Sequence, residues 1–397
     1  DFLISEFFYD NMYYLLSTKR AMKRVLLLYI SNNSGHHRAT KAIEEALYLA
    51  RTDVKVMNMN CFNYTNPVLE KVINSIYNKV IKIKPEVWEY LYDNPKIVRR
   101  TRKFRKLIHK LNSKKLEKLI SKFNPDVIAC SQAFPCGMVA DFKKKSKRDF
   151  ALIGVLTDYA PHSYWMYDNV TAYIVPSKQC KKRFISSGIE KDRIFPYGIP
   201  ISPKFFKSTN KEATRRSLRL NDDLMTILIM GGGQGLGPIE DLIYAVNTIE
   251  KPFQIIVVCG TNKKLRNWLE KRKLLFRKKM AVLGYTREVE MLMDISDIVV
   301  TKPGGLTTAE ALTKNLPLVI VNPIPGQEAK NTEFLLSEGV AVKAKNPLDA
   351  AVLIEDLLNN PKKLEQMKLN TQKHAQPQSA IKAADLILDL IENKTKK

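Results

Sequence analysis

The sequence predicts an α/β protein built from two Rossmann-like, doubly wound domains that face each other across a central cleft. Short apolar runs of strand length alternate with helical segments, as in parallel sheets covered by helices. This rhythm stops near a segment that contains glycine and proline and then restarts, which indicates a second domain. Two strand-to-helix junctions of the second half are glycine-rich, where such folds bind phosphate groups.

The first half supplies the strands of one predicted sheet. Val25–Ile30 is expected to be a buried strand, and the loop after it leads into a helix that ends near Ala50. The later strands are predicted at Val54–Met59, Asp126–Ser131, Phe150–Leu156 and Tyr173–Ser177. We place this domain at residues 1–200, with the helix 379–397 packing back on it, and the linker at 201–222.

The second half, residues 223–378, repeats the pattern and is expected to form the second domain. A helix is expected to begin at Leu306. The predicted strands are Met225–Met230, Gln254–Cys259, Met280–Leu283, Asp297–Thr301 and Leu316–Asn322.

Composition narrows the class of protein. The net charge of +25 over 397 residues predicts attraction to a polyanion: nucleic acid, an anionic bilayer or a phosphorylated substrate. The five cysteines form no C-x-x-C pair, so neither a zinc site nor a disulfide framework is expected, and a reducing compartment fits. No apolar run reaches the ~18–20 residues that span a bilayer, so we expect a soluble or peripheral protein.

Two loops of the second half are predicted to bind a diphosphate. The first follows a strand and opens a helix, and its glycines are Gly231, Gly232, Gly233, Gly235 and Gly237. The second runs through Lys302, Gly304, Gly305, Leu306 and Thr307, with Glu310 one turn inside the helix, where a carboxylate can accept hydrogen bonds from a ribose. Glycines that only permit tight turns, a solvated lysine and an acid that only offsets the helix dipole are the alternatives.

Polar residues after other strands are further candidates. Gln327 and Glu328 offer the donors and acceptors that sugar hydroxyls require, although a turn before a helix explains them equally well. His36 is expected at the carboxyl edge of the first sheet, where an imidazole can take a proton from an attacking hydroxyl. Asp158, at the same edge, suits orienting a base, binding an acceptor hydroxyl or capping a turn.

Taken together, these segments resemble the monogalactosyldiacylglycerol synthase and processive diacylglycerol glucosyltransferase family, which is related to the bacterial peptidoglycan N-acetylglucosaminyltransferase. Seven motifs in the same order over residues 25–345 are far more specific than any one alone. They are Gly35-His36, Thr157-Asp158 to Trp165, Val175-Pro176-Ser177, Tyr197-Gly198-Ile199-Pro200, Gly231–Gly237, Lys302–Glu310 and Asn322–Glu328.

The resemblance implies a GT-B fold, as in glycosyltransferase family 28, with the donor on the C-terminal domain and the acceptor on the N-terminal one. It implies inverting transfer from a UDP-sugar, with no cofactor or metal required. His36 matches the family's candidate base, the glycine loops its diphosphate contacts, Glu310 the ribose contact, and Gln327 and Glu328 the sugar contacts. Gly284-Tyr285 stands beside the expected uracil, whereas Asn33 replaces a glycine that many relatives have.

The positive charge concentrates in one segment. Lys96–Lys122 has twelve Lys or Arg residues against one acid, with apolar residues at helical spacing. Such a helix suits an anionic bilayer interface. The alternative, which periodicity alone favours, is a stripe that packs on the sheet with its lysines solvated. The predicted membrane or acceptor residues are Trp88, Arg99, Arg100, Arg102, Lys103, Phe104, Arg105 and Trp165. A second basic stretch, Lys263–Lys279, is suited to attract either the bilayer or the anionic donor.

We therefore expect an inverting hexosyltransferase that acts on diacylglycerol, or a glycosyldiacylglycerol, at the inner face of the cell membrane. Its expected partners are anionic lipids, diacylglycerol and a UDP-sugar, and not nucleic acid. A polyprenyl-linked acceptor is the alternative within the enzyme class. A basic nucleic-acid-binding protein and an inactive membrane sensor are the alternatives outside it, and the identity of the sugar stays open.

Overall fold

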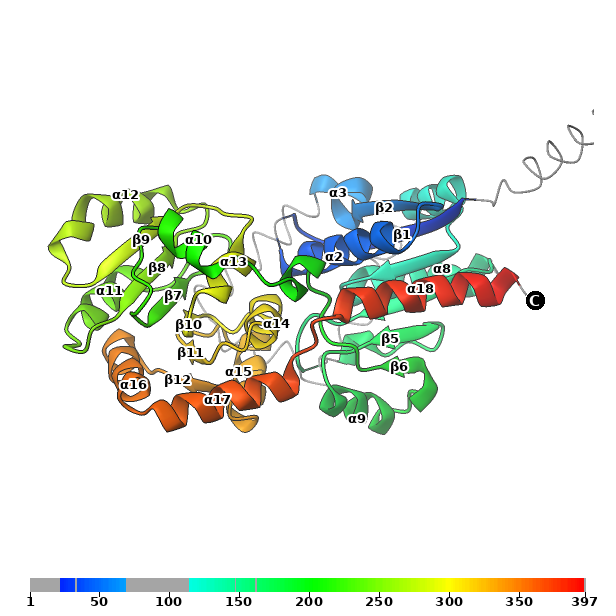
Figure 1. The fold of residues 1–397 in the computed structure, drawn as a ribbon. Coiled ribbons are helices and arrows are strands. Elements are labelled where there is room, and N and C mark those ends of the chain that lie inside the picture. Colours follow the sequence, from blue (N-terminus) through cyan, green and yellow to red (C-terminus); the bar gives the residue numbers. More distant parts are fainter. Residues whose placement is uncertain (1–21, 33, 69–113, 147, 161–162, 396–397) are drawn as a thin grey trace, which may run out of the picture.

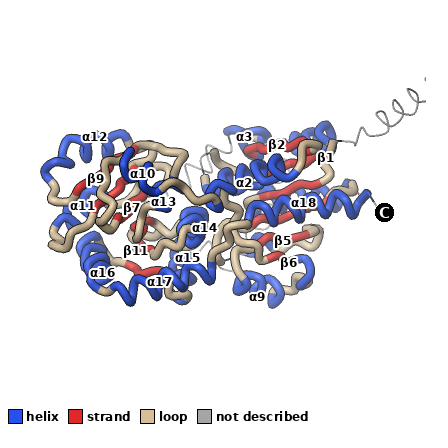
Figure 2. Tube along the Cα trace, viewed as in Figure 1, coloured by secondary structure: helices blue, strands red, loops and turns tan. Residues whose placement is uncertain are grey.

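The computed structural model describes residues 22–32, 34–68, 114–146, 148–160 and 163–395. Within these ranges the chain forms two six-stranded sheets, one in each half, with helices packed around them (Figures 1 and 2). All paired strands in both sheets are parallel. The α/β class with two doubly wound halves is therefore confirmed.

The first sheet has the strand order β2-β1-β3-β4-β5-β6. Its strands are β1 (Lys23–Tyr29), β2 (Val54–Asn60), β3 (Val127–Cys130), β4 (Ala151–Val155), β5 (Ala172–Ile174) and β6 (Ile194–Phe195). The helices of this half are α2 (Gly35–Ala50), α3 (Cys61–Thr65), α8 (Ala133–Ser146), η1 (Ser163–Trp165), α9 (Lys178–Ser186) and η2 (Lys191–Arg193), and residues 114–123 are also helical.

The second sheet has the order β9-β8-β7-β10-β11-β12, the dinucleotide-fold order in which the first strand of the half lies in the middle. Its strands are β7 (Thr226–Met230), β8 (Gln254–Val258), β9 (Lys279–Leu283), β10 (Ile298–Thr301), β11 (Leu318–Ile320) and β12 (Ala341–Lys343). The helices that follow the first half are η3 (Pro203–Phe206), α10 (Lys211–Ser217), α11 (Ile239–Asn247), α12 (Lys263–Arg272), η4 (Lys273–Leu275), α13 (Val289–Asp294), α14 (Gly305–Thr313), α15 (Gln327–Ser337), α16 (Pro347–Asn359), α17 (Pro361–His374) and α18 (Ser379–Thr395).

The central strands are apolar on both faces because both faces are covered. In β1, Leu26 and Leu28 belong to one buried cluster, whereas Val25 and Leu27 belong to the cluster on the opposite face. A strand of this kind reads as a continuous apolar run without alternation, which is why its position could be predicted from the sequence.

Two short strands, β6 and β12, were not predicted. They have two and three residues and lie at the edges of their sheets, so they carry too few residues for a periodic signal. The predicted strand Leu316–Asn322 was too long at both ends, since β11 covers only Leu318–Ile320. Asn322 has a φ of 46°, a left-handed conformation that turns the chain out of the sheet.

The last helix, α18, returns to the first half and lies along α2 (Figure 1). Its Ala383 and Ile387 are fully buried in the cluster that covers β1. Near its end, Glu392 Oε1 lies 2.9 Å from Lys23 Nζ and 2.8 Å from Arg51 Nη1. The last helix of the described chain is thus packed against the first sheet, close to β1.

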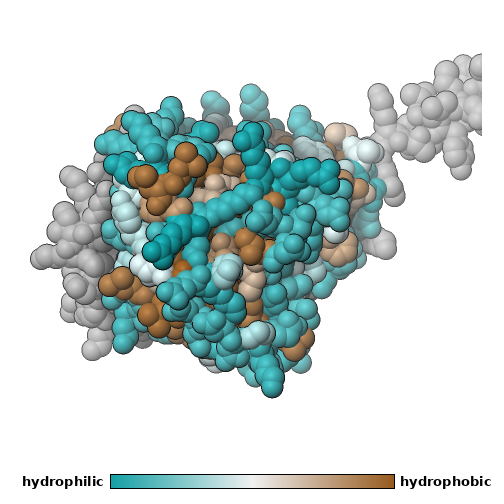
Figure 3. Space-filling view, turned by 60° about the vertical axis from the view of Figure 1, so that its left-hand side comes forward, coloured by the Kyte–Doolittle hydropathy of each residue, from teal (hydrophilic) through white to brown (hydrophobic). Residues whose placement is uncertain are grey.

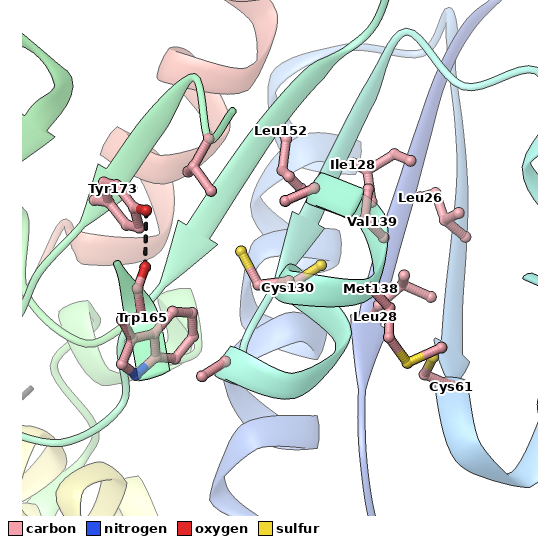
Figure 4. Close-up of a cluster of buried hydrophobic side chains, with 14 of the residues drawn as sticks. Leu26, Leu28, Cys61, Ile128, Cys130, Met138, Val139, Leu152, Trp165 and Tyr173 are labelled. Atoms are coloured by element: carbon pink, nitrogen blue, oxygen red, sulfur yellow. Dashed lines mark hydrogen bonds between the residues drawn. The ribbon is translucent and has the colours of Figure 1, made fainter. Parts of the chain in front are cut away.

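Two candidates for a membrane contact, Trp165 and the apolar stripe on helix 114–123, lie in the core of the first half. Figure 4 shows Trp165 in this core. Trp165 is only 5% exposed, and its carbonyl accepts a hydrogen bond from the Tyr173 hydroxyl at 2.8 Å. Its indole therefore packs in the core, and the expected membrane or acceptor contact of this residue is corrected. The stripe on helix 114–123 is buried in the same cluster, so the alternative of packing on the sheet holds for Leu116, Leu119, Ile120 and Phe123.

Candidate active site

The candidate site lies where both sheets reverse their strand order. In the first sheet the order switches between β1 and β3, and in the second it switches between β7 and β10. Open parallel sheets bind ligands outside the carboxyl ends of the strands at such a point. His36 follows β1 and Ser131 follows β3, whereas Gly231 follows β7 and Lys302 follows β10. The two switch points thus present the predicted site residues His36, Gly231 and Lys302.

His36 is the second residue of α2 and is held by its Nδ1 atom. This nitrogen lies 3.0 Å from the carbonyl oxygen of Ser131 and 2.7 Å from the hydroxyl of Thr157. Because a carbonyl oxygen only accepts, the neutral ring carries its proton on Nδ1 and donates it there. The lone pair of Nε2 is left to accept a proton from another group.

The environment of His36 also favours the neutral ring. Burial lowers the pKa of His36 below its ordinary value of 6.5, while the nearby Asp158 carboxylate and the Ser131 carbonyl act in the opposite direction. A neutral imidazole with an available Nε2 is the form that can act as a general base near neutral pH. The ring contacts Ser131 and Thr157 through its Nδ1 atom, so these two residues, rather than Asp158, fix its orientation.

Asp158 is instead connected to the second half of the chain through Asn331. The Asn331 side-chain nitrogen donates to Asp158 Oδ1 and to the Pro303 carbonyl, both at 3.0 Å. The amide oxygen of Asn331 accepts from the Tyr159 backbone N–H at 2.8 Å. The side chain of Asn331 is fully buried, and its two donors and one acceptor lone pair all have partners.

The two halves touch closely at the start of α14. A Cβ atom added to Gly305 would lie 1.9 Å from the Thr157 carbonyl oxygen and 3.2 Å from Ile199 Cδ1. Only glycine therefore permits this approach. The N-cap residue of α14, Gly304, makes no side-chain capping bond, and the first turn has no acid. The N-terminus of α14 is thus an anion-binding end close to the His36 loop.

Glu310 lies one turn inside α14 and is paired across the halves. It is 2% exposed, and its Oε1 atom lies 3.1 Å from Arg38 Nη2 on α2. Burial raises the pKa of Glu310 to about 7, with Arg38 opposing the rise and Glu290 adding to it. The Arg38 side chain is 48% exposed, so a ligand that competes for Glu310 can displace it into water.

Lys302 and Glu328 form a second pair, within the second half of the chain. Lys302 Nζ lies 3.6 Å from Glu328 Oε1, and the other carboxylate oxygen accepts from the Ile324 N–H at 2.7 Å. Burial raises the pKa of Glu328, whereas Lys302 and the Ile324 N–H oppose the rise. Gln327 begins α15 directly after Gly326, whose φ of 90° turns the loop toward the helix. The lysine directly after β10 and the carboxylate at the start of α15 thus stand side by side.

The glycine run after β7 forms a tight loop that packs against the segment between β8 and α12. Gly235 has a φ of 59°, and a Cβ atom there would lie 2.0 Å from the Cys259 carbonyl oxygen. The N–H groups of Gly235 and Leu236 donate within the loop, to Gly232 and Gly231. These two amides are therefore occupied, and the loop's approach to a phosphate depends on its other main-chain groups. Asn262 holds the loop by donating from its side chain to the Gly235 carbonyl at 3.2 Å.

Both halves of the chain are similar to known protein families. Residues 36–201 match the family described as monogalactosyldiacylglycerol (MGDG) synthase, and residues 210–374 match glycosyl transferases group 1. The chain is 28% identical to the processive diacylglycerol beta-glucosyltransferase of Bacillus licheniformis, over 94% of this chain and 97% of that protein. The enzyme of that name from Bacillus subtilis is 29% identical, over 88% of this chain and 90% of its own length.

The resemblance to the diacylglycerol glycosyltransferase family is confirmed. Among solved structures, MurG of Acinetobacter baumannii has a TM-score of 0.61 at 16% identity, covering 92% of this chain and 99% of that one. A putative UDP-N-acetylglucosamine 2-epimerase from Listeria monocytogenes also reaches 0.61, at 13% identity and 95% and 97% coverage. Anabaena HepE, solved with UDP-glucose, has a TM-score of 0.53 at 14% identity, with 93% and 99% covered. The two-sheet arrangement is the GT-B fold.

The remaining predicted site residues of this glycosyltransferase divide into two groups. Gly284 and Tyr285 follow β9, the edge strand of the second sheet, and the Tyr285 side chain is 58% exposed. The other predicted membrane or acceptor residues lie outside the described residues: Trp88, Arg99, Arg100, Arg102, Lys103, Phe104 and Arg105. In the described part of the chain, no cluster of three metal-ligating side chains occurs and no helix is long and apolar enough to cross a membrane.

Three residues of the site were not selected from the sequence of this glycosyltransferase. Ser131 orients His36, Arg38 pairs with Glu310, and Asn331 joins Asp158 to the Lys302 loop. Asn331 stands four residues after Gln327 on α15, so helical spacing places both on one face and could have identified it. Arg38 and Ser131 act through partners that are distant in sequence, for which a single chain gives no signal.

Proposed function

We propose that this chain is an inverting glycosyltransferase that moves a hexose from a UDP-sugar to diacylglycerol, or to a glycosyldiacylglycerol, at a membrane surface. It is a hexosyltransferase acting on diacylglycerol, as its relatives' names and its family matches support. The observation that carries the proposal is the position of His36, whose Nδ1 lies against the Ser131 carbonyl so that Nε2 is left to accept a proton, next to the uncapped N-terminus of α14 on the opposite half.

The chemistry follows from these two groups. His36 Nε2 takes the proton of the acceptor hydroxyl as its oxygen attacks the anomeric carbon of the sugar. The bond from that carbon to the diphosphate oxygen breaks, and UDP leaves with the electron pair. A single displacement inverts the anomeric centre, so an α-linked donor yields a β-glycoside. The charge that develops on UDP is stabilised by the N-terminal amides of α14 and by Lys302.

The donor half is proposed to bind the UDP-sugar. Glu310 accepts hydrogen bonds from the ribose, and the glycine loops contact the diphosphate. Gln327 and Glu328 contact the sugar hydroxyls, and Tyr285 lies beside the uracil. The fold's likeness to a protein solved with UDP-glucose supports a nucleotide-sugar donor. In this scheme helix N-termini and Lys302 neutralise the diphosphate, so the chain's own residues supply the electrostatic stabilisation.

The acceptor half is proposed to meet the membrane. We place the acceptor domain at residues 1–200 together with α18, the linker at 201–222 and the donor domain at 223–378. The basic segment Lys96–Lys122 carries a net charge of +11 and supports binding to anionic lipids at the inner face of the cell membrane. Its described part packs on the sheet, so the proposed membrane contact rests on the residues before it.

The direct test incubates the purified chain with diacylglycerol in phosphatidylglycerol vesicles and with each common UDP-sugar in turn. Released UDP is measured, the lipid product is identified by mass spectrometry, and its anomeric configuration is determined by NMR. The proposal predicts a β-glycosyldiacylglycerol with one donor strongly preferred. A product formed only with a polyprenyl phosphate acceptor, or an α-glycoside, would contradict it.

A further inference from the structure

The donor half carries an exposed apolar tip far along the chain from the basic segment of the acceptor half. Leu274 and Leu275, at the end of η4, are 92% and 78% exposed, and they are the two most exposed large apolar side chains of the described residues. Two adjacent leucines held in water by a short helical turn are unfavourable in the isolated protein. The exposure of the two leucines is explained if they insert into an apolar environment outside the protein.

An aromatic cluster adjoins this tip. Tyr244 of α11 packs edge-on against Trp268 of α12 and against Phe276, with ring centroids 5.5 Å apart in both cases. Trp268 and Phe276 are 6.3 Å apart, and Tyr244 is 53% exposed. Tyrosine and tryptophan combine an apolar ring with a polar group, which suits the boundary between an apolar phase and water. The three rings therefore extend the apolar tip into a broader surface.

Cations surround the same surface. Lys271 and Arg277 are exposed on either side of the leucines, and the Arg272 guanidinium lies 5.1 Å from the Trp268 ring centroid. The one acid of Lys263–Lys279, Glu270, is paired with Lys273 at 2.6 Å. The surface is therefore strongly positive. We call it the η4 patch, which consists of Tyr244, Trp268, Leu274, Leu275 and Phe276 with Lys271, Arg272, Lys273 and Arg277.

We propose that the η4 patch is a second membrane-docking surface, by which the donor half binds the anionic lipids of the bilayer. The two leucines enter the acyl region, the aromatic rings lie at the interface, and the cations contact lipid phosphates. Charge complementarity identifies this occupant, because an apolar tip ringed by cations matches an anionic bilayer. Nucleic acid would pair with the cations but would leave both leucines in water.

The position of the patch fits the proposed function, on which this inference rests. Figure 1 places α12, which leads into η4, along the same upper side of the molecule as α3, after which the chain enters residues 69–113. Figure 3 brings the donor half forward and shows that its surface is mostly hydrophilic with separate apolar patches. Docking of both halves would hold the proposed site around His36 and α14 near the bilayer from which the lipid acceptor enters.

The test compares binding of the full chain to vesicles of phosphatidylcholine with and without phosphatidylglycerol, measured by flotation. In Leu274→Asp/Leu275→Asp we expect at least about tenfold weaker binding to vesicles, because two aspartates do not enter the acyl region of the bilayer. In Lys271→Glu/Arg277→Glu the preference for phosphatidylglycerol should fall while the apolar tip is retained. The matched control is Val352→Asp/Leu369→Asp, which changes two exposed apolar side chains of α16 and α17 in the same way.

Turnover separates this inference from the proposed function. The leucine variant should lose turnover on diacylglycerol in vesicles and keep it on a short-chain diacylglycerol in detergent micelles. His36→Ala should lose turnover in both assays and keep vesicle binding. Wild-type vesicle binding by the leucine variant, or an equal loss in the control, would overturn the inference. So would a variant that loses affinity for duplex DNA and none for vesicles.

Discussion

At the scale of single residues, the site is made of polar side chains whose partners fix their protonation or orientation. His36 is held by Ser131 and Thr157 so that Nε2 is free to accept a proton, and burial lowers its pKa. Burial raises the pKa of Glu310, although its half-exposed partner Arg38 opposes the rise. The two shifts have opposite consequences for pH dependence.

The lowered pKa of His36 predicts the pH dependence of turnover. A general base must be neutral, so kcat at saturating donor should rise with pH through a midpoint below 6.5 and stay constant above neutrality. Initial rates measured from pH 5 to pH 9 in micelles test this prediction. A rising limb centred clearly above neutrality would show that another group acts as the base.

The raised pKa of Glu310 predicts a pH-dependent stability. Its carboxyl titrates at about 7 in the folded chain and at about 4.5 when unfolded, so the folded state binds more protons between these values. Stability should therefore fall as pH rises from 4.5 to 7, and the loss should persist above that. Glu310→Gln removes this loss, and we expect on the order of 1–3 kcal/mol higher stability at pH 8 and little change at pH 4.5.

Urea denaturation of both proteins at the two pH values measures this difference. Equal changes in stability at both pH values would contradict the assigned shift. Arg38→Gln is a useful comparison, because it removes the favourable partner and should raise the pKa of Glu310 further.

Asn331 is predicted to position Asp158 and the Lys302 loop. Asn331→Ala leaves the Tyr159 N–H, the Pro303 carbonyl and Asp158 without this partner, and we expect a loss of about 2–4 kcal/mol in stability. Asn331→Asp keeps the acceptor and removes both donors, so kcat should fall at least about tenfold with a smaller change in the KM of the donor.

Asn370 offers a matched control for this prediction. Its side-chain nitrogen also donates to a backbone carbonyl, that of Gly339 at 3.2 Å, but away from the site. Asn370→Asp should change stability and leave kcat near the wild-type value. A folded Asn331→Asp protein with wild-type kcat would show that Asn331 is only structural.

At the scale of elements, the start of α14 determines how closely the halves approach. Gly305→Ala would place a Cβ atom 1.9 Å from the Thr157 carbonyl oxygen, so either the helix or the neighbouring half must move. We expect a loss of about 1–3 kcal/mol in the free energy of unfolding. Gly304→Ala is the control, since nothing lies within 4 Å of its added Cβ atom and its φ of −64° is ordinary. Thermal unfolding measures both, and equal melting temperatures would contradict the close contact.

The strands show which elements a single sequence can predict. Runs such as that of β1 are apolar at every position because both faces are covered, and this signal is strong. Edge strands β6 and β12 have two and three residues and give none. Amphipathic spacing was ambiguous: the stripe on helix 114–123 meets the sheet, because periodicity identifies an apolar face and not what covers it.

The site residues that directly follow strands could be predicted from the sequence. The pairs between residues far apart in the sequence could not. The glycine loops, His36 and Glu310 stand at strand-to-helix junctions, so their place at the switch points follows from topology. The Arg38–Glu310 pair joins residues 272 positions apart, and nothing local marks it. Trp165 was misplaced because tryptophan suits both a membrane interface and a core.

At the scale of the whole molecule, two parallel-sheet halves meet at their carboxyl edges and bring His36, the proposed base, close to the N-terminus of α14. Neither half has both parts, since His36 lies on the first and α14 on the second. Contacts across the halves, through Arg38–Glu310, Thr157–Gly305 and Asn331, hold this approach. The α18 helix returns to the first half, so the chain crosses between the halves twice.

The central claim is that His36 is the base of sugar transfer from a UDP-sugar to diacylglycerol. The most direct measurement compares single-turnover transfer by the wild type and by His36→Ala, together with the affinity for the UDP-sugar. We predict that transfer falls by about 10²–10⁴-fold in the variant while the dissociation constant stays within about twofold. Transfer at the wild-type rate in a folded His36→Ala protein would contradict the account.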